Sequence, residues 1–463
     1  MARPSTAALF TVILLAASCD GGDTTPTDKT GETSPTDTGP TDTGPTDTGP
    51  TGTGTTDTGP DLTCAGDEWL AGGFWDFDAS FSGPSMLATS LSLDALGAPV
   101  LLLNQLGPGN APSSLTLRWR EPTDPDGELP RIFDWAGLPP GTGTGTGTGA
   151  GTGAGWLPLG RVLEETSEGS LVGGQLHDGT RTIPFAARID RSAGSIEPWI
   201  LDPDVASGSV TAGPVFTAEG SWWLGEITEP GGVSEIVVWR IDAGDVVSEE
   251  LRYTSLSTPG SGEMVPGALA VADDGRVLVG GGARSPVVAE QGAFLLAGGV
   301  GGFTELLAMP SSETSGVPGA ILAAGSRADR LAYVWGGLAD PADPADPSWR
   351  LYDGTLSDPA SATLADEDTT GETAAPMALS LHPSGAVFAS GGWVRADGKP
   401  PAPYVRMGVD GSYTTTFAAP GPNPGWINVV DITDDGLPWA LCVYSSDGVA
   451  TDEIVILEMV CLL

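Results

Sequence analysis

The chain has 463 residues, with 60 acidic and 19 basic side chains and a formal net charge of −41 at pH 7. This charge argues against nucleic acid as a partner, because phosphate binding needs clustered Lys and Arg. The 68 Gly and 40 Pro residues, with few helix-period apolar stretches, favour an all-β fold with many turns.

The N-terminal segment is predicted to be a secretory signal. Arg3 precedes an apolar run over residues 7–17 that is too short to span a bilayer, and small residues follow it. The run leads into the letters AASC, which end at Cys19 and resemble the lipobox of bacterial lipoproteins. The resemblance implies that residues 1–18 are removed and that Cys19 is lipidated, which would anchor the protein to a bacterial membrane. An ordinary cleaved signal with an incidental cysteine is the alternative.

Residues 19–62 have the composition of a disordered tether. They hold almost no large apolar side chains and include three consecutive copies of Pro-Thr-Asp-Thr-Gly over residues 35–49. Such a segment cannot bury enough apolar surface to fold. As a flexible coil it would span roughly 35 Å, which would keep the folded part clear of the membrane.

Residues 63–463 carry seven turn signals, each followed by a short apolar run of β type. The turn residues are Gly97, Gly169, Gly220, Gly275, Asp329, Gly385 and Gly436. Successive turns are 51 to 56 residues apart except for the first step of 72, and that step contains the 15-residue Gly/Thr loop at 141–155, without which it is 57. A period near fifty with strand-type units predicts a seven-bladed β-propeller.

Each repeat unit reads as four antiparallel strands. The first strand is apolar, the second often ends in paired glycines such as Gly173-Gly174 and Gly280-Gly281, the third closes on Asp before a turn, and the fourth is weaker. Paired glycines in a strand indicate that backbones or rings approach closely there. The Gly-Gly ending and the period resemble kelch-type propellers over residues 68–463. This resemblance implies an architecture and no particular activity.

The two ends of the folded part are predicted to meet in one blade. The seventh unit lacks a fourth strand, and a run of β type at 69–77 is left over at the other end. Pairing that run beside 454–461 would remove an exposed edge and would bring Cys64 near Cys461. Secretion favours a disulfide between them, leaving Cys442 as a buried free thiol. A bond between Cys64 and Cys442 is the competing pairing.

The search for chemistry yields no catalytic residue, metal-ligand set or cofactor site. The common hydrolase and nucleotide-binding signatures are absent, and His177 and His382 read as surface or packing residues beside turns. Acidic pairs such as Asp273 and Asp274 read as solvated turn residues, with Ca²⁺ binding as the alternative.

Tryptophan is the residue type most worth weighing for ligand binding, with 14 copies. Trp222 and Trp223 are adjacent on a strand and must point to opposite faces of it. Trp135, Trp393 and Trp426 lie at predicted strand ends or loops, where a ring could stack on a sugar or peptide. Packing between blades is the favoured interpretation for all of them.

Two function classes remain. The first is a non-catalytic propeller that binds a protein or glycan ligand and is held, as a monomer, on a lipid anchor in the cell envelope, in the periplasm or at the cell surface. The second is a propeller enzyme acting on extracellular glycans or polymers, which would need acids that converge near the axis. The acidity is expected to serve as a soluble coat, with adaptation to high salt or a cationic partner as alternatives.

Overall fold

The computed structural model describes residues 69–76, 86–95, 97–107, 111–119, 131–138, 155–232, 234–254, 263–284, 292–310, 320–327, 329–338, 347–368, 378–382, 386–393, 402–409, 412–418, 425–432, 438–444, 451 and 453–461. The predicted signal and tether, Cys19, Cys64 and residues 141–154 of the Gly/Thr loop lie outside the described residues. Within the described part, no helix is long and apolar enough to cross a membrane.

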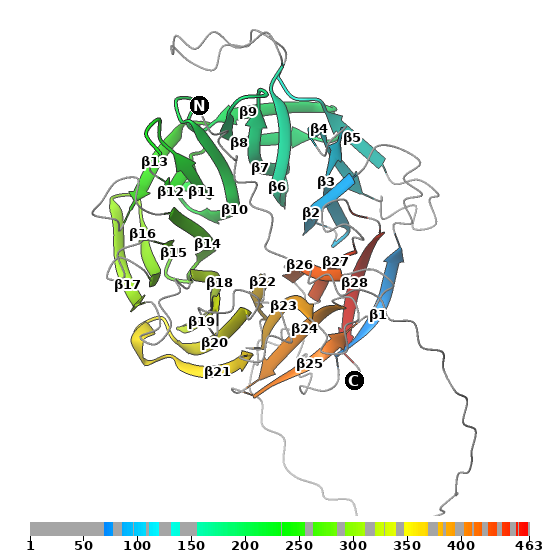
Figure 1. Cartoon of the computed structure of the whole chain (residues 1–463). Coiled ribbons are helices and arrows are strands. Elements are labelled where there is room, and N and C mark those ends of the chain that lie inside the picture. Colours follow the sequence, from blue (N-terminus) through cyan, green and yellow to red (C-terminus); the bar gives the residue numbers. More distant parts are fainter. Residues whose placement is uncertain are drawn as a thin grey trace, which may run out of the picture.

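Seven four-stranded antiparallel sheets stand around a common axis, and each sheet is one blade (Figure 1). In every blade the first strand lies innermost and the fourth lies outermost (Figure 1). The predicted fold class, an all-β propeller of seven four-stranded blades, is therefore confirmed. The short apolar runs after regular turns produce this propeller. Each sheet that they form has two apolar faces, and only neighbouring blades can cover those faces.

Blades 1 to 4 follow one another along the chain. Blade 1 is β2 (Met86–Leu93), β3 (Pro99–Leu106), β4 (Pro112–Trp119) and β5 (Arg131–Trp135). Blade 2 is β6 (Leu157–Thr166), β7 (Gly169–His177), β8 (Thr182–Asp190) and β9 (Ser195–Ile200). Blade 3 is β10 (Ser207–Thr217), β11 (Gly220–Thr228), β12 (Ser234–Ile241) and β13 (Val247–Tyr253). Blade 4 is β14 (Glu263–Val271), β15 (Val277–Arg284), β16 (Gly292–Gly299) and β17 (Gly302–Pro310).

The ring continues through two more regular blades to a composite one. Blade 5 is β18 (Ala320–Arg327), β19 (Arg330–Leu338), β20 (Pro347–Thr355) and β21 (Thr363–Asp368), with a 3₁₀ turn η3 (Pro359–Ser361) before β21. Blade 6 is β22 (Ala378–Leu381), β23 (Val387–Trp393), β24 (Ala402–Val409) and β25 (Ser412–Ala418). Blade 7 is β26 (Gly425–Ile432), β27 (Pro438–Tyr444), β28 (Glu453–Cys461) and β1 (Trp69–Asp76).

Blade 7 closes the ring with strands from both ends of the described chain. β1 lies antiparallel to β28, with Trp69 opposite Cys461 and Asp76 opposite Val455. The two strands lie side by side in the ring, although they are far apart in the sequence (Figure 1). The predicted sharing of one sheet by the two ends is confirmed, and the outer edge of β28 is covered.

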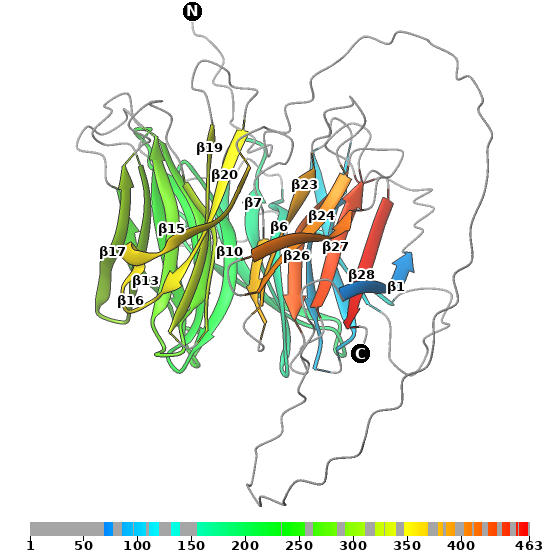
Figure 2. The ribbon, with the colours of Figure 1, turned by 90° about the horizontal axis from the view of Figure 1, so that it is seen from below.

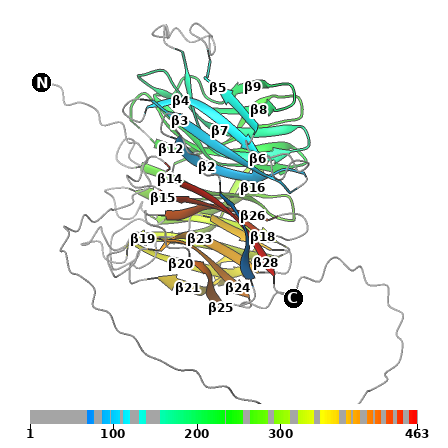
Figure 3. The same ribbon diagram turned by 90° about the vertical axis from the view of Figure 1, so that its right-hand side faces the viewer.

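The propeller has two faces that differ in their connections. The strands run from one face to the other, as Figures 2 and 3 show from two sides. Because the strands are antiparallel, the turns between first and second strands and between third and fourth strands lie on the same face, which we call the turn face. Five of the predicted turn residues, Gly97, Gly169, Gly220, Gly275 and Asp329, lie at the first of these turns, and Gly385 and Gly436 lie outside the described residues.

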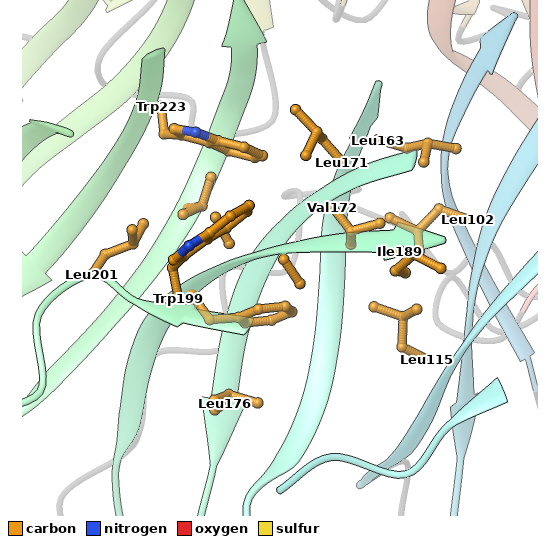
Figure 4. Packing of buried hydrophobic residues seen from close by; sticks show 14 of the residues in the cluster. Leu102, Leu115, Leu163, Leu171, Val172, Leu176, Ile189, Trp199, Leu201 and Trp223 are labelled. Atoms are coloured by element: carbon orange, nitrogen blue, oxygen red, sulfur yellow. The ribbon is translucent and has the colours of Figure 1, made fainter. Parts of the chain in front are cut away.

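The core fills the spaces between blades. Trp222 and Trp223 of β11 are both fully buried, and they belong to separate apolar clusters on opposite sides of blade 3. Trp223 packs with Leu171 and Val172 of blade 2 (Figure 4), whereas Trp222 meets Phe303 of blade 4 with ring centroids 6.2 Å apart. The predicted opposite orientation of the two indoles is confirmed.

The paired glycines Gly173 and Gly174 each lie where a side chain would not fit, and for different reasons. A Cβ on Gly173 would lie 2.7 Å from the ring of Trp223, so the bare backbone makes room for the next blade. A Cβ on Gly174 would lie 2.0 Å from the carbonyl oxygen of Leu159, where the first strand bulges between Gly160 and Val162. Glycine is needed at both positions because any side chain would collide with a ring or a backbone atom.

Candidate functional site at the axis

Three inner strands bring polar side chains together at the turn face. Ser92 lies on β2, Glu164 on β6 and Asp431 on β26, in blades 1, 2 and 7, which are neighbours around the axis (Figure 1). Each stands five residues before a predicted turn glycine and two residues after the bulge of its first strand. They are therefore equivalent positions of the repeat, and we call them the axial polar tier.

The tier is polar on one side only. The residues two positions after the bulge in blades 4 and 5 are Ala270 and Gly325. Small side chains there satisfy packing at the inner strand, so the fold itself does not require a carboxyl group at this position. The polar residues of blades 7, 1 and 2 thus depart from what the architecture alone demands.

Hydrogen bonds tie the tier to the end of β2. The Leu93 amide donates to Asp431 Oδ2 at 3.3 Å, and the Glu165 amide donates to Ser92 Oγ at 3.0 Å. Blades 7 and 2 are in this way both attached to blade 1 beside the axis.

Burial changes the acidity of both carboxyl groups. Burial raises the pKa of Glu164 to about 8, and repulsion from Asp431 and Glu165 acts in the same direction, while the Ser92 hydroxyl opposes it. Burial also raises the pKa of Asp431, against the hydrogen bonds that its carboxylate accepts from the Ile432 and Leu93 amides. A carboxyl group that keeps its proton near neutral pH can donate a hydrogen bond as well as accept one.

Glu165 has a different environment from its neighbour. Its side chain is only 1% exposed, and its Oε2 lies 2.6 Å from Arg191. Arg191 in turn lies 4.8 Å from the ring centroid of Trp119 in blade 1. Burial raises the pKa of Glu165, and the charge of Arg191 opposes that rise. We interpret Glu165 as part of the contact between blades 1 and 2.

Most arginines in the described part form ion pairs inside or between blades. On third strands, Arg188 lies 3.9 Å from Glu197, Arg240 lies 2.8 Å from Glu250, and Arg350 lies 3.3 Å from Glu367, with each acid on the fourth strand of the same blade. Arg252 forms ion pairs with four carboxylates, those of Asp202, Glu229, Glu235 and Glu249. The few cations of this acidic chain are thus largely engaged with acids of the outer blades.

The two histidines take the positions expected of packing and turn residues. His382 is 2% exposed, and its ring lies 6.1 Å from that of Phe388. His177 ends β7, and its Nδ1 accepts a hydrogen bond from the Gly179 amide at 3.3 Å. They lie in blades 6 and 2, so the structure does not bring them together.

The predicted acidic turn at Asp273 and Asp274 lies at a shallow hollow between blades 4 and 5. The hollow measures about 420 Å³ and is lined by Asp273, Asp274, Arg276, Asp329, Leu356 and Ser357. Arg276 lies 2.7 Å from Asp274 and holds the pKa of that carboxyl group below its usual value. Among the described residues, no group of three or more His, Cys, Asp or Glu side chains is placed to hold a metal ion.

The tryptophans considered for stacking separate into two groups. Trp135 is 7% exposed and packs edge-on against Phe185 with centroids 5.4 Å apart, so it serves the core between blades 1 and 2 and offers no stacking surface. Trp393 ends β23 and Trp426 lies at the start of β26, and their side chains lie outside the described part.

The cysteines are placed only in part. Cys442 is a fully buried free thiol on β27, as the sequence predicts, and burial raises its pKa. The backbone of Cys461 ends β28 opposite Trp69. Cys64 lies outside the described residues, so its pairing with Cys461 or Cys442 stays a prediction, as does the lipidation of Cys19.

The search for single motifs missed the axial polar tier. Glu164 and Asp431 stand in strands that otherwise look apolar, and no local pattern links them. A signal was present in the repeat, because aligning the units on their turn glycines places Ser92, Glu164 and Asp431 in one column. The same column also holds Ser380 of blade 6, whose hydroxyl donates to the Val430 carbonyl oxygen at 2.7 Å, so comparing columns for carboxyl groups would have singled out Glu164 and Asp431.

Comparison with known proteins finds similarity of shape only. No family model matches the chain, and no curated protein matches it. The periplasmic gluconolactonase of Pseudomonas aeruginosa is 14% identical with a TM-score of 0.43, covering 71% of this chain and 84% of that one. The α-L-arabinanase of Penicillium chrysogenum is 11% identical with a TM-score of 0.39, covering 81% and 93%. The Aleuria aurantia lectin is 9% identical with a TM-score of 0.38, covering 74% and 99%.

Proposed function

We propose that this chain is a lipid-anchored propeller of the bacterial cell envelope that binds a glycan or protein ligand at the axial polar tier. In this proposal Cys19 carries the anchor, residues 19–62 form the tether, and the propeller acts as a monomer with kelch-like repeats. Ligand binding is the function, and no cofactor takes part.

The observation that supports binding at the axis is the convergence of Glu164 and Asp431 beside Ser92. Partly buried carboxyl groups that repel each other reduce the stability of a fold, and equivalent positions in blades 4 and 5 show that the ring does not need them. A protonated carboxyl, a carboxylate and a hydroxyl together offer both donors and acceptors. Sugar hydroxyls and peptide groups are ligands that such a mixed set can bind.

The test compares the full chain with Glu164→Gln and Asp431→Asn on immobilised glycans and in pull-downs from envelope extract. Each variant keeps the size of the side chain and removes its ability to ionise, and we expect binding of the captured ligand to fall by at least about tenfold. Glu197→Gln is the matched control, because Glu197 is a 60% exposed carboxylate on an outer strand. Binding that is unchanged in both axial variants would contradict the site.

The anchor is tested on the same chain. Acyl labelling of the wild type that is lost in Cys19→Ala, with release of the variant from the membrane fraction, is the expected result. Membrane retention of the unlabelled variant would contradict a lipid anchor at this residue.

An enzyme acting on extracellular glycans is the second candidate, and the pKa of Glu164 is the observation that favours it. A carboxyl group that stays protonated beside a second carboxyl group is the arrangement that glycoside hydrolysis uses. The two candidates differ in one readout. An enzyme would release new reducing ends from a bound glycan, and Glu164→Gln would abolish that release while binding persists.

A further inference from the structure

Arg161 lies on the inner strand β6 of blade 2. It is the extra residue of the bulge in β6, where Gly160 pairs with Gly174 and Val162 pairs with Gly173. Its Nε is buried and has no hydrogen-bond partner, and among the described residues no carboxylate lies within ion-pair distance of its guanidinium. Burial lowers the pKa of Arg161, and the charge of Glu226 in blade 3 opposes this effect.

Among the described residues, Arg118 also has a buried Nε and a pKa lowered by burial, with the charge of Asp134 in its own blade opposing that effect. Arg191, Arg240 and Arg330 are comparably sheltered, with side chains 18%, 15% and 25% exposed, and each contacts a carboxylate. Arg327 is exposed, so water solvates its guanidinium. A buried Nε–H group without an acceptor is unfavourable unless something supplies one.

The backbone that carries Arg161 is held firmly by blade 1. The Asn104 side chain, fully buried on β3, donates to the Gly160 carbonyl oxygen at 2.8 Å and accepts from the Gly160 amide at 2.7 Å. The Thr89 hydroxyl donates to the same carbonyl oxygen at 3.0 Å. Thr89 is itself the extra residue of the bulge in β2. The position next to Arg161 is therefore fixed in advance, which favours binding because little has to be ordered.

We propose that Arg161 is an anion-binding residue of this propeller and that it takes the carboxylate of a hydroxylated acid, such as a uronic acid unit of a glycan. The guanidinium offers a fork of N–H donors that matches a carboxylate. The hydroxyl groups beside that carboxylate would face the axial polar tier, whose carboxyl and hydroxyl groups can donate and accept hydrogen bonds. The proposal rests on the ligand-binding function above and names the chemical class of the ligand.

The experiment measures the thermal unfolding of the full chain with D-glucuronate, D-glucose or sodium chloride, with glucuronate and chloride at equal ionic strength. Glucose has the same hydroxyl groups and lacks the carboxylate, and chloride controls for the screening of this acidic chain. We expect glucuronate at saturation to raise the Tm of the wild type by about 2 °C above the chloride control. Glucose should not change it.

The variants decide the assignment. Arg161→Gln should lose the response to glucuronate, and Arg161→Lys should keep the charge and only part of the response because it loses the fork. Arg240→Gln, which removes an arginine already paired with Glu250, should respond like the wild type. A full response in Arg161→Gln and Arg161→Lys, or no response in the wild type, would overturn the proposal. Either result leaves the binding test with Glu164→Gln unaffected, so the two proposals can fail separately.

Discussion

At the scale of single residues, Glu164 links acidity to stability. Its pKa is raised from 4.5 to about 8 in the folded state, so folding takes up a proton between these pH values. The stabilising contribution of the protonated form is complete below pH 4.5 and is lost as pH rises through about 8. Burial and the neighbouring carboxyl groups of Asp431 and Glu165 cause this dependence, and all of them oppose a negative charge at Glu164.

Glu164→Gln should remove this dependence. Above pH 8 the variant should be more stable than the wild type, by up to about 5 kcal/mol, whereas below pH 4.5 the two should be nearly alike. Denaturant unfolding at both pH values measures the difference, with the exposed Glu197→Gln as control. A variant that is less stable than the wild type above pH 8 would show that the fold favours the ionised Glu164 carboxylate, which would contradict the raised pKa.

The residue scale is also where prediction from the sequence was weakest. Trp135 packs on Phe185 from the next blade, which confirms the favoured interpretation, but the sequence could not name that partner. Glu164 and Asp431 gave no local signal, because their proximity depends on where three inner strands end. Arg161 could not be singled out, since its state arises from a bulge and from the absence of a nearby acid. Side-chain environments depend on packing between blades, which local patterns do not encode.

At the scale of elements, each strand of a blade is stabilised mainly by the blades beside it. β11 shows this most directly, because its adjacent indoles fill the spaces on both sides of blade 3. Strands and turns could be predicted well for the same reason, since alternation and turn glycines recur in every unit. The bulges in the inner strands could not be predicted, because a bulge changes the register by one residue and has no distinctive composition.

Trp223→Ala should therefore destabilise the propeller by about 3 to 5 kcal/mol, through a cavity between blades 2 and 3. The matched control is Phe216→Ala on β10 of the same blade, because Phe216 is 44% exposed, and its effect should stay within about 0.5 kcal/mol. Urea unfolding followed by tryptophan fluorescence and circular dichroism measures both. Equal losses in the two variants would contradict packing between blades as the main stabilising term.

At the scale of the whole molecule, the ring depends on the contact between β1 and β28. Trp69 lies opposite Cys461, and Cys64 precedes Trp69 by five residues, a length of chain that reaches at most about 18 Å. Cys442 is fully buried on β27, and β28 separates that strand from β1. These positions support Cys461 as the partner of Cys64 over Cys442.

Peptide mapping without reduction should recover Cys64 joined to Cys461. The chain-entropy model gives such a long loop a stabilisation of about 5 kcal/mol at most, so Cys461→Ser should lower the Tm in oxidising buffer and should match the wild type after reduction. Recovery of Cys64 joined to Cys442, or of both cysteines as free thiols, would contradict this pairing.

The shared blade also constrains how the protein can be made. β1 leaves the ribosome first among the strands, but its partner β28 is the last to emerge, so nearly the whole chain must be synthesised before the two can meet. Until then β1 has no sheet to join, and nascent blades expose edges to other molecules. The ring can therefore close only after β28 has been made, so closure is a single late step of folding.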